Sequence, residues 1–269
     1  MNPIDLSRVI ELPKVIAYIR TLQKKSGGFG ATRRLPATIE DTYHSIAIFR
    51  LLAADLSVDS ELADCRSDRL LLGFIERMWA NPQLDVKTIY QLYATAMDLN
   101  AGFDPAPMRA LAAKRLQQQT TLRTYFYTAM ILGSACLPLL QRQLGPEWLY
   151  RIFPLRRICE GIFMALGAVQ ASCVEIPEPL QTELIDWLQR CQTPDGGFGF
   201  MPGTTSFIEN THFCLKSLTR LQAKPEDTQK AVAFISRCQT RYGGFGRRGL
   251  ASPFLDSTYH AIASLSILA

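Results

Sequence analysis

The chain has 269 residues, of which 48% are hydrophobic and 20% are charged. This composition is typical of a globular protein with a large buried core and excludes an intrinsically disordered one, although length alone allows one domain or two. The net charge of +5 is dispersed without a long basic run, so we expect no nucleic-acid partner.

The N-terminal residues and the most apolar stretch bear on location. Residues 1–5 lack the basic start and apolar stretch of a secretory signal. The most apolar stretch, residues 125–140, is shorter than the ~20 residues that a bilayer span needs, and it contains Pro138. We therefore predict a cytoplasmic protein with no membrane span. The seven cysteines include no C-x-x-C pair, so we interpret most of them as small core residues.

A Gly-Gly-Phe-Gly motif occurs three times, beginning at Gly27, Gly196 and Gly243. A helical pattern that ends in a glutamine precedes each motif, and an acidic residue follows thirteen positions after the first glycine. Two positions after each acidic residue stands a threonine, at Thr42, Thr211 and Thr258. Such fixed spacing indicates an internal repeat, and the glycine motif itself predicts a turn that ends a helix.

A second helix is predicted after each threonine, where apolar residues recur at helical period, as in residues 43–48 and 259–264. In the first repeat Thr38 and Asp41 have the spacing of an N-terminal capping signal. Each unit therefore reads as an outer helix, a glycine-rich loop and an inner helix, which together form an antiparallel hairpin.

Three more degenerate units fill the middle of the chain, with inner-helix candidates near residues 87–90, 123–126 and 157–160. The total is six hairpins. Six similar hairpins can close on themselves, so that neither end of the array needs a cap. We predict an all-α fold in which residues 1–269 form a single α/α toroid domain, with an inner and an outer ring of helices.

The order of Gly-Gly-Phe-Gly, a spacer, an acidic residue and Thr-Tyr before an apolar helix resembles the repeat of prenyltransferase β subunits and squalene cyclases. The resemblance spans nearly the whole chain and is weakest over residues 56–173. It implies a central cavity that holds an isoprenoid, for example a prenyl diphosphate. Because β subunits of this family work with a helical α subunit, the resemblance also implies that this chain could have a helical partner subunit.

Aromatic residues near the starts of the inner helices suit a prenyl chain or a carbocation, and core packing explains them equally well. They are Tyr43, Tyr90, Tyr125, Phe126, Tyr127, Phe213 and Tyr259.

The resemblance to protein prenyltransferases implies a zinc site made by an aspartate, a cysteine and a histidine. The matching positions here hold Glu209, Thr211 and Asp256, so two of the three ligands change type and zinc is not expected. Mg²⁺ stays open as a cofactor.

Two arginine pairs, Arg33 with Arg34 and Arg247 with Arg248, lie at comparable places in adjacent units of a closed ring. We expect them either to clamp a diphosphate or to be solvated loop residues.

Residues 38–42 resemble the Asp-x-Asp-Asp-Thr motif of class II terpene cyclases, except that Thr38 replaces the first aspartate. The resemblance implies that Glu40 donates the proton, buried so that its carboxyl stays neutral, with Asp41 as its hydrogen-bonding neighbour. The equivalent acids Glu209 and Asp256 are also explained by capping and by the helix dipole.

All three histidines follow the repeated threonines by one or two positions, at His44, His212 and His260. We expect one of two roles for them. Either they form a metal or acid-base cluster with the repeated acids at one mouth of the cavity, or they are ordinary structural histidines.

Three functions stay open. The leading hypothesis is prenyl transfer without the usual zinc site. The alternatives are class II-type cyclisation with Glu40 as proton donor and a non-catalytic lipid-binding or partner module. The candidate catalytic residues are Glu40, Asp41, Glu209 and Asp256. The candidate substrate-binding residues are His44, Tyr90, Phe126, His212, Tyr259, His260, Arg33, Arg34, Arg247 and Arg248, and no residue is predicted as a metal ligand.

Overall fold

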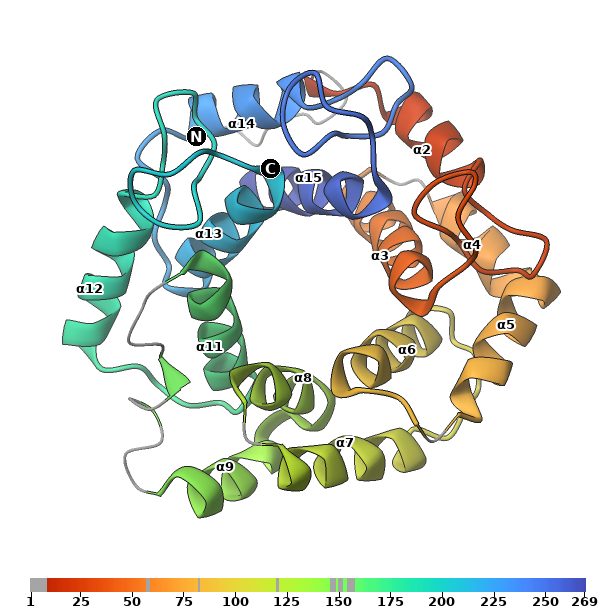
Figure 1. Ribbon diagram of the computed structural model, residues 1–269, viewed down its shortest axis with the longest axis horizontal. Helices are drawn as coiled ribbons and strands as arrows, with labels where there is room; N and C mark the ends of the chain where they lie inside the picture. The colour runs from red at the N-terminus through yellow and green to blue at the C-terminus, as the bar shows by residue number, and fades with distance from the viewer. Residues whose placement is uncertain are drawn as a thin grey trace.

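The computed structural model describes residues 9–56, 59–81, 83–119, 121–145, 149, 152–153 and 158–269. These residues form two concentric rings of helices (Figure 1). The inner ring consists of α3 (Ile39–Leu56), α6 (Val86–Asp98), α8 (Leu122–Leu132), α11 (Cys159–Ala171), α13 (Ile208–Arg220) and α15 (Leu255–Leu268). The outer ring consists of α2 (Leu12–Arg20), α4 (Asp59–Ser67), α5 (Arg69–Trp79), α7 (Ala106–Gln118), α9 (Leu137–Leu144), α12 (Glu178–Gln189) and α14 (Thr228–Arg237), with the short helix η1 (Gly133–Cys136) before α9. The predicted all-α toroid is confirmed.

Each inner helix packs against the next along the chain, and α15 packs against α3, which closes the ring (Figure 1). The inner-helix candidates of the middle units are confirmed in α6, α8 and α11, although Arg157 lies outside the described residues. Helix α4 is an addition that the two-helix repeat did not predict. No helix in the described ranges is long and apolar enough to cross a membrane.

The first glycine of each repeated motif sits where a side chain would not fit. Gly27, Gly196 and Gly243 have φ angles of 101°, 94° and 95°. A Cβ atom on them would lie 1.9 to 2.1 Å from a backbone carbonyl oxygen in the first turn of the next unit's outer helix. The loop of the last unit makes this contact with Lys14 of α2, so the glycine turn joins the end of the chain to its beginning.

The repeated threonines hold these loops in place. Phe29, Phe198 and Phe245 are fully buried, and each donates its backbone N–H to the threonine of its own unit, 3.0 Å away. Each threonine hydroxyl in turn donates to the carbonyl four residues before it, on the residue just before the inner helix, so it ties the loop to the start of that helix. The constant spacing in the sequence therefore reflects a hydrogen bond that occurs once in each clear unit.

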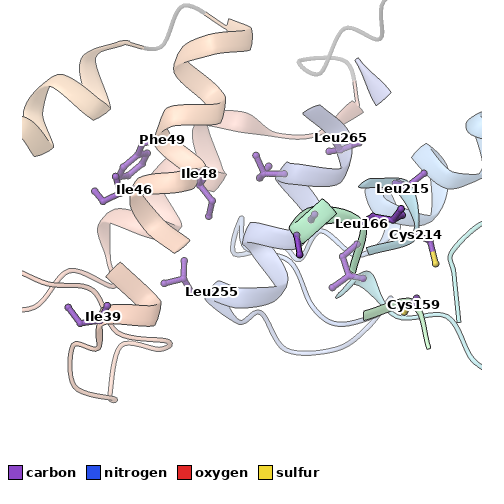
Figure 2. Close-up of a cluster of buried hydrophobic side chains, with 14 of the residues drawn as sticks. Ile39, Ile46, Ile48, Phe49, Cys159, Leu166, Cys214, Leu215, Leu255 and Leu265 are labelled. Atoms are coloured by element: carbon purple, nitrogen blue, oxygen red, sulfur yellow. The ribbon is translucent and has the colours of Figure 1, made fainter. Parts of the chain in front are cut away.

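Apolar side chains fill the space between neighbouring helices (Figure 2). Ile46 and Phe49 of α3 are fully buried, as are Leu255 of α15 and Cys214 of α13. The repeat cysteines Cys191 and Cys238 are buried too, as their interpretation as core residues predicted. Fully burying one such large aliphatic or aromatic side chain contributes about 1.5 to 3 kcal/mol. Contacts with neighbouring helices therefore stabilise the inner helices, and the side of each that faces the ring axis is left to line the centre of the ring.

Candidate functional site

All six inner helices contribute side chains to a cavity of about 640 Å³ at the centre of the ring, which we call the lumen. A second cavity of about 1110 Å³, the mouth cavity, lies over the first turns of α3, α6 and α8. The two cavities share the side chains of Glu40, His44, Lys87, Gln91 and Asp256. The mouth cavity therefore adjoins the lumen.

The fifth residue of every inner helix is aromatic or a histidine, and it lines the lumen. These residues are Tyr43, Tyr90, Phe126, Phe163, His212 and Tyr259. Together with Tyr127, Phe213, His260 and His44 from the sixth positions of their helices, they form what we call the aromatic girdle. Consecutive rings follow one another around the axis with centroid separations of 4.9 to 6.0 Å.

Two aromatic residues differ from the sequence expectation. Tyr125 is buried in the core between helices and does not line the lumen. Phe163 of α11 belongs to the girdle, although the sequence reasoning omitted it. Counting five residues from the start of each inner helix would have found Phe163, but the boundary of α11 lay in the most degenerate part of the sequence.

The second residue of every inner helix is charged, which places a ring of charges at the mouth. The residues are Glu40, Lys87, Arg123, Glu160, Glu209 and Asp256. Five of the six form ion pairs: Lys87 Nζ lies 2.5 Å from Glu40, Arg123 lies 3.6 Å from Glu160, and Glu209 pairs with Arg247 in the loop before α15. Asp256 is exposed and accepts a hydrogen bond from the backbone N–H of Ser257.

The burial expected of Glu40 is wrong. Its side chain is 47% exposed and its carboxylate is paired with Lys87, because the second residue of α3 points along the rim towards α6. The neighbouring Asp41 is the buried acid, at 8% exposure. Burial raises the pKa of the Asp41 carboxyl. The hydrogen bonds that Asp41 accepts from the Thr38 hydroxyl, at 2.6 Å, and from the backbone of Ala31 lower this pKa but do not cancel the effect of burial.

The three histidines lie inside the girdle and are neutral. Nδ1 of His212 is 2.8 Å from Nδ1 of His260, so one ring donates and the other accepts. His44 stacks on Tyr259 with a centroid separation of 4.7 Å, and its buried Nδ1 has no hydrogen-bond partner among the described residues. Burial is the main cause that lowers the pKa of all three, and it brings that of His260 to about 3.

Of the two alternatives for the histidines, the cluster with the repeated acids does not form among the described residues. No hydrogen bond between described residues joins the imidazoles to Glu40, Glu209 or Asp256, because the acids stand one turn nearer the mouth. Within the same described ranges no three histidine, cysteine or acidic side chains converge to hold a metal ion. At the positions of the family's zinc ligands, Glu209 is engaged by Arg247 and the Thr211 hydroxyl is used by its own loop.

The two arginine pairs do not meet at the lumen. Arg33 and Arg34 are exposed on their loop, and Arg247 stacks over Phe207 while it pairs with Glu209. Arg248 borders a different cavity, beside Asp195. None of the four lines the lumen or the mouth cavity, since their loops lie outside the ring of inner helices.

The cations of the lumen are Arg50 of α3 and Lys216 and Arg220 of α13, together with Lys87 at the mouth. Sequence reasoning missed the first three because they lie about one and a half to two and a half turns beyond the repeated threonines. Only the closure of the ring brings α3 and α13 to one cavity.

Residues 6–101, 161–225 and 210–269 match the model of the prenyltransferase alpha-alpha toroid domain, which together is more than half of the chain. The chain belongs to this family. A comparison with curated proteins gave no match.

Solved structures of similar fold include Candida albicans protein geranylgeranyltransferase-I complexed with GGPP, which is 14% identical with a TM-score of 0.63 over 95% of this chain and 90% of that chain. A variant of the type II terpene cyclase MstE from Scytonema, in complex with its substrate geranylgeranyl dihydroxybenzoate, is 12% identical with a TM-score of 0.63 over 98% and 97% of the two chains. MstE without ligand gives a TM-score of 0.58 at 12% identity, over 98% of this chain and 96% of that chain. At these identities the likeness shows a shared fold.

Proposed function

We propose that this protein cyclises an isoprenoid that occupies its lumen and the adjoining mouth cavity, by protonating an alkene as a type II terpene cyclase does. The observation that carries the proposal is the aromatic girdle, to which all six inner helices contribute. Aromatic faces attract cations electrostatically, and a carbocation that moves along a folded prenyl chain needs such faces on every side. The two solved neighbours bind GGPP and geranylgeranyl dihydroxybenzoate, which are both prenyl compounds.

Asp41 takes the role of proton donor in this proposal, in place of Glu40. A carboxyl whose pKa is raised by burial keeps its proton to higher pH, whereas Glu40 is paired with Lys87 as a carboxylate. The proton of Asp41 adds to one alkene carbon, and the resulting cation is attacked by the next alkene to form a ring bond. Loss of a proton from the cyclic cation to solvent ends the reaction, and the Asp41 carboxylate takes up a proton from solvent at the mouth cavity. The product is then an isomer of the substrate.

Prenyl transfer to a thiol has less support from the same residues. Glu209 and Thr211, at two of the three zinc-ligand positions of the family, are both occupied by contacts within the protein. In addition, Thr211 lacks the sulfur of the family's cysteine and Asp256 lacks the nitrogen of its histidine, which are the donors that zinc prefers.

The experiment is incubation of the purified protein with geranylgeranyl diphosphate, squalene or geranylgeranyl dihydroxybenzoate, with and without Mg²⁺ or Zn²⁺. Extracts are analysed by mass spectrometry and NMR. We expect a product of unchanged mass with fewer alkenes. A prenylated acceptor with released diphosphate would favour prenyl transfer, and tight binding without any turnover would favour a non-catalytic lipid-binding module.

A further inference from the structure

The two ends of the lumen differ in charge. At the mouth, the second residues of the inner helices include acids, and the cations Lys87 and Arg123 are each paired with one of them. At the far end the charged lining residues are Arg50, Lys216 and Arg220, in the later turns of α3 and α13. At 1.5 Å per residue, this far end lies about 10 to 16 Å beyond the mouth, past the aromatic girdle.

Arg220 is held in a fixed position at the far end. Its Nη1 donates to the carbonyl of Phe163 at 2.7 Å and its Nε donates to Gln170 at 3.2 Å. The guanidinium also lies over the Phe163 ring, 4.7 Å from its centroid. No carboxylate among the described residues pairs with it, and burial lowers its pKa to about 10, so it stays charged at neutral pH.

Lys216 stands one turn before Arg220 on the same helix, half-buried in the lumen wall. Its ammonium makes no hydrogen bond or ion pair with the residues that the structure describes. Burial and the nearby charges of Arg220 and Arg50 lower its pKa. The charge of Arg50 is offset by Asp98, 3.1 Å away. Two cations are therefore left without a protein counter-charge in one corner of the cavity.

Uncompensated cations in a partly buried site are unfavourable unless a ligand supplies the opposite charge. We propose that Lys216 and Arg220 bind the anionic head group of the isoprenoid substrate, a carboxylate or a diphosphate. The hydrocarbon chain then crosses the aromatic girdle, and its distal alkene lies towards Asp41 at the mouth. This inference rests on the proposed function, to which it adds the class and the orientation of the substrate.

The test compares the affinities of three probes that carry the same C20 chain: neutral geranylgeraniol, geranylgeranyl diphosphate and the carboxylate geranylgeranyl dihydroxybenzoate. Isothermal titration calorimetry is applied to the wild type, Lys216→Met and Lys216→Arg. A charge-assisted hydrogen bond in such a site corresponds to about a tenfold change in affinity. We expect Lys216→Met to lower the affinity for one or both anionic probes by that factor and to leave the affinity for geranylgeraniol unchanged. Lys216→Arg should retain the affinity for the anionic probes.

Lys224→Met is the matched control, because it removes the same charge from an exposed position just after α13 and should leave all three affinities unchanged. The anionic probe with the larger loss identifies the head group as diphosphate or carboxylate. The inference is overturned if geranylgeraniol binds the wild type as tightly as both anions, or if Lys216→Met weakens all three probes equally; cyclisation stands in either case. Failure of every probe to bind the wild type would overturn the proposed function itself.

Discussion

Gln239 hydrogen-bonds the backbone of Glu11 on both sides, although 228 residues separate them. The N–H of Glu11 donates to Gln239 Oε1 at 3.0 Å, and Gln239 Nε2 donates to the Glu11 carbonyl at 3.3 Å. Glu11 is the N-cap residue of α2. Gln192 makes the same pair of contacts with Asp227, the N-cap residue of α14. The ring is thus closed by the same interaction that joins two consecutive units.

Replacing the closing glutamine should destabilise the ring about as much as replacing an internal one. We expect Gln239→Ala and Gln192→Ala each to lower the free energy of unfolding by about 1 kcal/mol, the usual net contribution of such hydrogen bonds. Urea denaturation followed by circular dichroism measures the loss, with exposed Gln229→Ala as control. If Gln192→Ala lowers the free energy of unfolding and Gln239→Ala leaves it unchanged, closure of the ring does not depend on the contact between Gln239 and Glu11.

The hydroxyl group of the threonine in each clear repeat should be needed for the stability of the fold. Thr258→Val leaves the buried N–H of Phe245 without an acceptor, which costs about 1 to 3 kcal/mol. Thr42→Val and Thr211→Val should lose similar amounts, because the geometry is the same in all three units. Thr258→Ser keeps the hydroxyl and serves as control. Equal midpoints of urea unfolding for the valine and serine variants would contradict this account.

The glycine turn at the closure should tolerate no side chain. Gly243→Ala combines a positive φ with a Cβ placed 2.0 Å from the Lys14 carbonyl oxygen, whereas Gly102→Ala has a positive φ of 71° and open space around it. The strain of the backbone alone costs about 1 kcal/mol. We expect Gly102→Ala to lose that much and Gly243→Ala to lose clearly more, as measured by thermal unfolding. Similar losses would mean that the loop shifts to accommodate the methyl group.

Acidification should destabilise the fold through the girdle histidines. Their pKa values are lowered in the folded state, so between pH 6.5 and 5 the unfolded chain binds protons that the folded chain does not. Stability is therefore present above the unfolded pKa and lost as pH falls, by up to about 1.4 kcal/mol per pH unit for each histidine.

Urea unfolding across this pH window measures the slope. His44→Phe keeps the stacking on Tyr259 and removes one titrating group, so its slope should be smaller by one proton. A wild-type stability that does not change between pH 6.5 and 5 would be incompatible with neutral, buried imidazoles.

Asp41→Asn and Glu40→Gln should separate the two candidate acids. If Asp41 donates the proton, Asp41→Asn lowers kcat of cyclisation by about 100-fold or more, the usual contribution of a general acid. Glu40→Gln removes the exposed partner of the ion pair with Lys87 and should keep most of the activity. Product formation is measured by mass spectrometry after folding of both variants is verified by circular dichroism. The reverse result would return the role to Glu40.

Much of the fold could be predicted because its signals are local. Gly27, Gly196 and Gly243 each need a positive φ, and each repeat threonine bonds a phenylalanine thirteen residues before it, so spacing along the chain reports the contact directly. The same logic reached His44, His212 and His260, whose register places them on the lumen side of adjacent inner helices. Phe163 was missed because its unit retains none of these signals.

The sequence by itself determined the hairpin unit, its repetition and the family, because turn geometry, capping and helical periodicity act over a few residues. Only the tertiary structure decided which acid is buried. Glu40 and Asp41 are adjacent, but Glu40 lies exposed on the rim and pairs with Lys87, 47 residues away, whereas Asp41 is buried and accepts hydrogen bonds from Thr38 and Ala31. The tertiary structure also decided the charge of the far end, because Arg50 meets Lys216 and Arg220 only when the ring closes. Burial and charge at a site depend on neighbours that closure brings from distant parts of the chain, and local spacing carries no record of them.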